Sequence, residues 1–133
     1  MKFMKHFVRF CGIYNASAVV VFLTPGALPL FGVPLPYSAF WVWLPALFGL
    51  FAGIVLFLSS ADLTKYGAFP YWNGIIRFVF VVVVFALDFR GTTGEFVGLL
   101  AMGDLFLALL CIFGLPWALG RSHLQLLTNR LSS

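Results

Sequence analysis

Residues 10–61 read FCGIYNASAVVVFLTPGALPLFGVPLPYSAFWVWLPALFGLFAGIVLFLSSA and contain no charged side chain. A helix that crosses a bilayer needs about 20 mostly apolar residues, so this stretch is long enough for two. Thr24-Pro25-Gly26 interrupts the stretch, and three more prolines before Tyr37 keep its middle out of regular helix. The sequence therefore predicts two membrane spans, at about residues 7–24 and 37–59.

Two further apolar stretches follow in the second half of the chain. They predict spans at about residues 72–89 and 95–117. Hydrophobic residues make up 62% of the chain and charged residues 9%, whereas soluble domains carry about 25% charged residues. This composition excludes a soluble domain and a nucleic-acid-binding module. We expect a single all-α domain, an integral membrane four-helix bundle in contact with the lipid bilayer.

The basic residues predict the orientation of this bundle. Four spans place both termini on one side of the membrane, and loops rich in Lys and Arg stay in the cytoplasm. Of the basic residues outside the spans, Arg90 alone falls on the opposite side. We therefore expect a multi-pass protein of the bacterial inner membrane with two cytoplasmic termini, each a short amphipathic helix. The residues that predict the cytoplasmic side are Lys2, Lys5, Arg9, Lys65, Arg121 and Arg130.

Asp104 is the ionisable residue that the sequence places deepest in the membrane. At 1.5 Å per residue it lies about 13 Å from the start of its span at Glu95, close to the bilayer centre. A carboxyl group at that depth has to face protein, water or a bound molecule, because contact with lipid is unfavourable. Small residues recur on the same helix face, which predicts that Asp104 points into the bundle. They are Gly98, Ala101, Ala108 and Cys111.

Three more polar residues complete the candidate site. Arg77 and Asp88 share one stripe of the third span, which predicts that both point inward, and Asn15 lies inside the first span. The expected vertical gap between Arg77 and Asp104 is about 10 Å. This gap leaves open a direct ion pair or a link through Asn15 or water. The cluster either fixes helix packing or forms a ligand site at Asn15, Arg77, Asp88 and Asp104.

The sequence holds few features of known catalytic or cofactor chemistry. Cys11 and Cys111 have similar expected depths, but they lack Cys-x-x-Cys spacing and lie toward the reducing cytoplasm, which favours inert buried thiols over a redox pair. Neither histidine falls within a predicted span, which argues against haem. There is no phosphate loop, metal cluster or hydrolytic triad. We therefore expect no metal and no cofactor.

Three short motifs carry a resemblance to a known family. Arg77 at the start of the third span, Gly103-Asp104-Leu105 in the fourth and Gly114-Leu115-Pro116 at its end resemble small four-helix bacterial membrane proteins grouped around DoxX. Some DoxX relatives are associated with thiosulfate:quinone oxidoreduction or with membrane redox complexes. The resemblance implies a four-helix membrane fold, and it assigns no catalytic role to a residue of this chain.

Two functions are compatible with these features. The first is a non-catalytic accessory or scaffolding subunit of a larger inner-membrane complex, such as an energy-converting one. Abundant aromatic residues and the uncharged segment 25–36 suit contacts with other membrane-protein subunits. Segment 25–36 is expected either to cover the bundle's own end or to contact such a subunit. The alternative is a small quinone- or lipid-binding membrane protein, or a DoxX-like redox enzyme, with a pocket at Asn15, Arg77 and Asp104.

Overall fold

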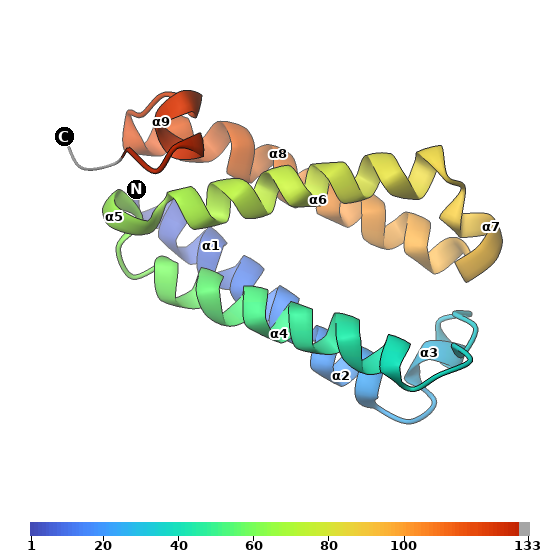
Figure 1. The fold of residues 1–133 in the computed structure, drawn as a ribbon. Helices are drawn as coiled ribbons and strands as arrows, with labels where there is room; N and C mark the ends of the chain where they lie inside the picture. The colour runs from blue at the N-terminus through green and yellow to red at the C-terminus, as the bar shows by residue number, and fades with distance from the viewer. Residues whose placement is uncertain (131–133) are drawn as a thin grey trace.

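A computed structural model describes residues 1–130, and helices make up most of this part of the chain (Figure 1). Four of its helical segments are long and apolar enough to cross a membrane, as the sequence predicts. They are α1 with α2, then α4, α6 and α8. The helices are α1 (Lys2–Ala16), α2 (Ala18–Leu23), α3 (Ala27–Leu30), α4 (Phe40–Ser59), α5 (Leu63–Tyr66), α6 (Ala68–Ala86), α7 (Phe89–Thr93), α8 (Glu95–Leu119) and α9 (His123–Leu127).

The first helix begins earlier than the sequence predicts. We expected a separate interfacial helix before residue 7, but α1 is continuous from Lys2. Met4 and Val8 are buried in the core, so the N-terminal residues already belong to the bundle. Their apolar side chains stabilise the helix more by packing there than by lying at a membrane surface. The C-terminal amphipathic segment forms the short helix α9, which starts with a capping box of Ser122 and Gln125.

The long helices are arranged as two pairs. In Figure 1, α1 and α2 lie beside α4, and α6 lies beside α8. The two pairs converge at the end that holds the N-terminus, α5 and α9, which we call the terminal end. They diverge toward the end that holds α3 and α7, which we call the loop end. Packing is therefore tight within each pair and uneven between the pairs.

The main hydrophobic core joins both pairs at the terminal end. Leu56 of α4, Leu63 of α5, Leu115 of α8 and Leu126 of α9 are all fully buried in it. Residues 61–67 join α4 to α6 and include α5, whose Leu63 fills part of this core. Close packing of these side chains supplies dispersion contacts between the two pairs, so this end is the best-packed part of the bundle.

The loop end is held by fewer contacts between the pairs. Segment 25–36 folds back onto the bundle there: Leu28 is buried, and the ring of Phe31 stacks on that of Phe96 at the start of α8, with 4.5 Å between ring centroids. Segment 25–36 thus covers part of the bundle's own end, one of the two outcomes expected for it. An aromatic pair of this kind contributes about 0.5–1.5 kcal/mol beyond its buried area.

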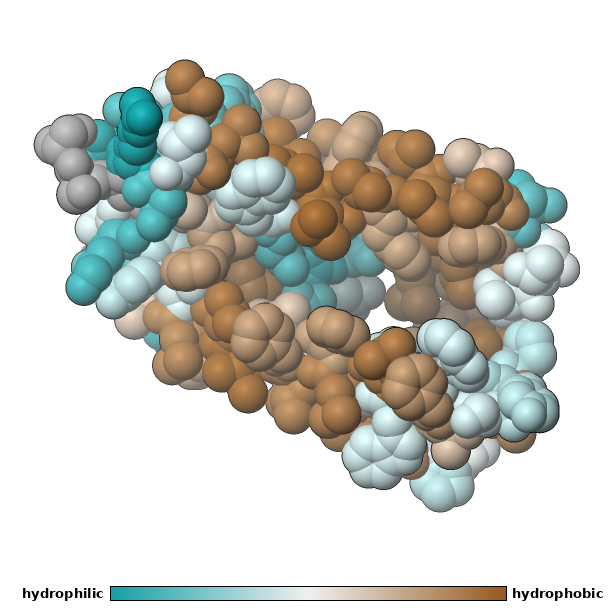
Figure 2. All heavy atoms as spheres, in the orientation of Figure 1, coloured by the Kyte–Doolittle hydropathy of each residue, from teal (hydrophilic) through white to brown (hydrophobic). Residues whose placement is uncertain are grey.

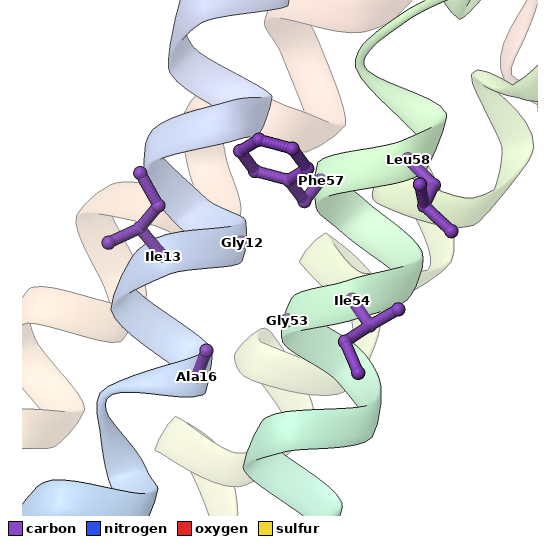
Figure 3. A pocket seen from close by; sticks show the side chains of 7 residues that line it. All are labelled: Gly12, Ile13, Ala16, Gly53, Ile54, Phe57 and Leu58. Carbon is purple, nitrogen blue, oxygen red and sulfur yellow. The ribbon is translucent and has the colours of Figure 1, made fainter.

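Close backbone contact joins α1 to α4. Gly12 and Gly53 face each other where the helices pass side by side, and Phe57 lies next to them (Figure 3). A Cβ atom on Gly53 would lie 2.6 Å from the carbonyl oxygen of Gly12, and one on Gly12 would lie 2.8 Å from that of Gly53. The helices approach this closely because neither residue has a side chain.

Asp62 caps α5 outside the spans and makes stability depend on pH. Its pKa lies below the ordinary value because the Thr64 hydroxyl and the backbone N–H groups of Lys65 and Thr64 donate hydrogen bonds to its carboxylate. A lowered pKa adds stability above the unfolded-state pKa of about 3.9, and this stability is lost as the pH falls through the folded-state pKa.

We therefore expect Asp62→Ala to lower the Tm in detergent at pH 7, and this difference from the native protein to shrink below about pH 4. Asp62→Asn is the control, because asparagine also caps a helix but does not titrate. As the solution is acidified, the Tm of the native protein should fall more than the Tm of Asp62→Asn. If the Tm difference between Asp62→Ala and the native protein stays constant across this pH range, the lowered pKa assigned to Asp62 is wrong.

Candidate functional site

A polar cluster lies between the two helix pairs, centred on Arg77 of α6. Its guanidinium Nε donates a hydrogen bond to Asn73 Oδ1 at 2.9 Å, and Nη2 donates one to Asn15 Oδ1 of α1 at 2.7 Å. Nη1 is hydrogen-bonded and ion-paired to Asp104 of α8. Arg77 is only 5% exposed. The long side chain of Arg77 spans the vertical gap expected between Arg77 and Asp104, so the ion pair between them is direct. Asn15 contacts the same guanidinium from the opposite helix pair.

Helix geometry places each member of the polar cluster. Asn73 lies one turn before Arg77 on α6, the i, i+4 spacing that lets two side chains meet. Asp104 projects from a face of α8 whose other members are small and buried, as the sequence predicts. The ring of Tyr14 on α1 lies beneath the guanidinium, with 5.4 Å between the Arg77 Cζ atom and the ring centroid. Three helices thus converge on one buried positive charge.

Asn15 has an unused donor. Its Nδ2 group is buried and has no hydrogen-bond partner among the described residues. Leaving a buried donor unsatisfied costs about 1–3 kcal/mol, so such groups are uncommon in folded proteins. Because Asn15 Oδ1 accepts from Arg77, which can only donate, the orientation of the amide is fixed and Nδ2 has to remain the donor.

A cavity of about 360 Å³ opens beside the polar cluster. Figure 2 shows hydrophilic atoms at the bottom of a hollow between the hydrophobic walls of the two helix pairs. The volume falls within the range of about 300–1,000 Å³ that is usual for small-molecule sites. The polar lining residues are Tyr14, Asn15, Ser17, Arg77 and Asp104, and the apolar ones are Ala18, Val21, Phe22, Gly49, Phe80, Phe96 and Leu100.

Asp88 does not join this cluster, contrary to the prediction from its stripe on the third span. Helix α6 ends at Ala86, and Asp88 has a left-handed backbone conformation with φ of 49°. The helical periodicity that would direct Asp88 inward therefore stops before it. Its side chain is 74% exposed, and its Oδ1 atom lies 3.9 Å from Arg90 Nη2. Val81 and Val84, which lie between Arg77 and Asp88 at helical spacing, are buried.

The two cysteines are neighbours. Cys11 of α1 and Cys111 of α8 are each 1% exposed and lie in the same core cluster. Their similar expected depths were the one sequence signal for this proximity. Asn73 was missing from the candidate site, although its i, i+4 spacing from Arg77 could have indicated it.

The motifs behind the DoxX resemblance have clear structural roles. Arg77 and Asp104 form the ion pair, and Gly114 packs close to Met4, whose Sδ atom would lie 3.1 Å from a Cβ atom at that glycine. These roles describe packing and assign no family to the chain. Comparison with protein-family models, with curated proteins and with solved structures finds no match for this chain.

Proposed function

We propose that this protein binds one amphipathic small molecule of the quinone or lipid class within the membrane, in the cavity between its two helix pairs. The observation that carries the proposal is the cavity itself: Asn15, Arg77 and Asp104 line its polar part, and the Asn15 amide keeps one donor, Nδ2, without a partner among the described residues. A carbonyl oxygen of a ligand would be an acceptor for the donors of this polar part. Quinones and lipid esters both carry such oxygens next to long apolar chains.

The charges in the cavity favour a neutral head group. Arg77 and Asp104 neutralise each other, so the polar end of the cavity offers hydrogen bonds without a net charge. Besides its three hydrogen bonds, the Arg77 guanidinium has two further N–H groups that can donate to a ligand. Apolar residues such as Phe22 and Leu100 line the remainder of the cavity and suit an apolar chain.

The positive charges support the orientation expected from the sequence. Arg90 lies at the loop end, beyond α6. By the positive-inside rule the terminal end is cytoplasmic, and the membrane is the bacterial inner membrane. The polar cluster then lies within the hydrocarbon region, reached by molecules dissolved in the bilayer. The basic residues of the terminal end are Lys2, Lys5, Arg9, Lys65, Arg121 and Arg130.

An accessory role in a larger membrane complex is the second candidate function. It is favoured by Leu30, Leu35 and Tyr37, three large residues near the loop end that are 68–103% exposed and lie outside the four apolar helices. Another membrane subunit could cover them. Purification of the native protein in mild detergent tests this role, because a stable partner chain has to copurify with it.

Leu100→Trp tests the ligand site without altering the polar cluster. The larger side chain is expected to fill the cavity and to weaken ligand binding at least about tenfold, a loss of about 1.4 kcal/mol. Native mass spectrometry of the protein in detergent, with a short-chain ubiquinone or a short-chain phosphatidylethanolamine, reports binding and separates the two ligand classes.

The matched control is Leu109→Trp, on the same helix and outside the residues that line the cavity. This variant should bind as the native protein does, and both variants should keep the native Tm. If the native protein binds neither compound, or if Leu100→Trp binds as tightly as Leu109→Trp, the proposal is wrong.

A further inference from the structure

Two apolar grooves lie next to each other on the outer surface of α4, with Leu58 between them. The first groove runs along the contact of α1 and α4, where Gly12, Gly53 and Phe57 line it, and has a volume of about 190 Å³ (Figure 3). The second lies where α4 meets α5 and α6, and has a volume of about 380 Å³. Leu58 lines both grooves and is 65% exposed, so it forms a ridge between them.

Helix geometry explains why a single residue separates the grooves. Ile54 and Phe57 lie on one side of Leu58 around α4 and line the first groove. Val55 and Ser59 lie on its other side and line the second. In a membrane these outer grooves face acyl chains, because α4 is apolar enough to cross it. Two grooves on the two sides of one ridge suit the two acyl chains of a single phospholipid.

Each groove has a basic side chain where it reaches the terminal end of the bundle. The Cζ atom of Arg9 lies 5.4 Å from the centroid of the Phe57 ring, which lines the first groove. The Nζ atom of Lys65 lies 5.1 Å from the centroid of the Tyr66 ring, which lines the second. Both basic residues are exposed. Aromatic and basic side chains are typical of the boundary between acyl chains and head groups, so the head group of a lipid in these grooves would lie there.

A third basic residue lies near the end of α4. Lys5 Nζ donates a hydrogen bond to the carbonyl oxygen of Ala61 at 3.2 Å, just after α4, and Lys5 precedes Arg9 by one helical turn on α1. The acidic side chain at this end is that of Asp62, and the other three lie in the polar cluster or at the loop end. Three positive charges therefore stand against one negative charge. This excess suits a phosphate group, which Arg and Lys both bind.

We propose that an anionic phospholipid binds here, with one acyl chain in each groove and its phosphate among Lys5, Arg9 and Lys65. Charge complementarity selects the anionic head group, and the paired grooves select a lipid with two chains. This site is separate from the cavity between the helix pairs, since the two sets of lining residues have no member in common. The inference is therefore independent of the ligand proposed for the cavity.

The head-group contacts are tested by native mass spectrometry of the full chain in mild detergent, with phosphatidylglycerol and phosphatidylcholine of the same acyl chains. Phosphatidylglycerol should bind at least about tenfold more tightly, because each nearby basic residue strengthens binding of an anionic lipid about fivefold. Arg9→Gln with Lys65→Gln should remove this preference. The control, Arg121→Gln with Arg130→Gln, takes the same charge from the other helix pair and should keep it. Equal binding of the two lipids to the native protein, or an equal loss in both double variants, would overturn the inference.

The grooves are tested by a bulky substitution at Val55, which lines the second groove. Val55→Trp should bind phosphatidylglycerol at least about tenfold more weakly than the control Val79→Trp, whose site is exposed on α6 and lines neither groove. Both variants should keep the native Tm. Leu100→Trp, which fills the cavity, should bind phosphatidylglycerol as the native protein does. If Val55→Trp binds as tightly as Val79→Trp, or if Leu100→Trp abolishes the binding, the lipid does not lie in these grooves and the inference is wrong.

Discussion

Replacement of Asp104 by asparagine is expected to lower the free energy of unfolding by about 3 kcal/mol, the largest effect of any single substitution in the polar cluster. Asparagine has nearly the same shape as aspartate but no charge. The guanidinium of Arg77 would then be a buried positive charge without a counter-charge, held by the amide oxygens of Asn15 and Asn73. Removing one partner of a buried ion pair costs far more than the pair itself contributes.

A double-mutant cycle separates the pairing from other effects of the substitution. Arg77→Met with Asp104→Asn leaves no buried charge in the pair, so the double variant should be more stable than the sum of the single losses predicts. Asp88→Asn is the matched control: this carboxylate is exposed, and its removal should change stability by less than about 0.5 kcal/mol. Unfolding in one detergent is measured for the native protein, Arg77→Met, Asp104→Asn, the double variant and the Asp88→Asn control. Additive losses would show that Arg77 and Asp104 are not coupled.

Gly53→Ala is expected to destabilise the protein by up to about 3 kcal/mol, by forcing α1 and α4 apart. The added Cβ atom would lie 2.6 Å from the carbonyl oxygen of Gly12 and 2.8 Å from the backbone nitrogen of Ala16. Both atoms belong to backbone, so no side-chain rotation can relieve the overlap. The helices have to separate, which also removes the dispersion contacts of neighbouring residues.

Gly103→Ala is the control for this substitution. A Cβ atom there meets nothing within 4 Å, and alanine favours helix over glycine by about 1 kcal/mol, so this variant should be as stable as the native protein or more stable. Tm values of both variants in the same detergent give the comparison. Equal Tm values for Gly53→Ala and the native protein would mean that this helix contact is looser than the structure indicates.

The sequence predicts the four apolar helices well because lipid imposes a simple requirement on them. A long uncharged segment between turn-forming prolines has few other stable structures, so the helices near residues 40–59 and 95–119 lie close to their expected bounds. The small-residue stripe of α8 also identifies the inward side of Asp104 correctly. Leu107 of the same helix packs in the terminal-end core, whereas Leu99 is exposed. Composition alone does not distinguish a leucine that faces lipid from one that faces protein.

Contacts between helices are harder to predict. Periodicity along the third span directs Asp88 inward, but it cannot show that the helix ends two residues earlier, where φ becomes positive. Nor can spacing within one helix reveal that Cys11 of α1 packs in the same core cluster as Cys111 of α8, because this arrangement depends on how the two helix pairs are oriented. The unsatisfied Nδ2 group of Asn15 likewise becomes visible only when all of its neighbours are placed.

The divergence of the two helix pairs has a consequence for selectivity. The pairs share the hydrophobic core at the terminal end, and at the loop end segment 25–36 links them through the ring of Phe31 on that of Phe96. The cavity between the pairs has mostly apolar walls, which restrict the orientation of a ligand less than hydrogen-bond donors in fixed directions do. We therefore expect ligands to be selected mainly by where they carry an oxygen atom.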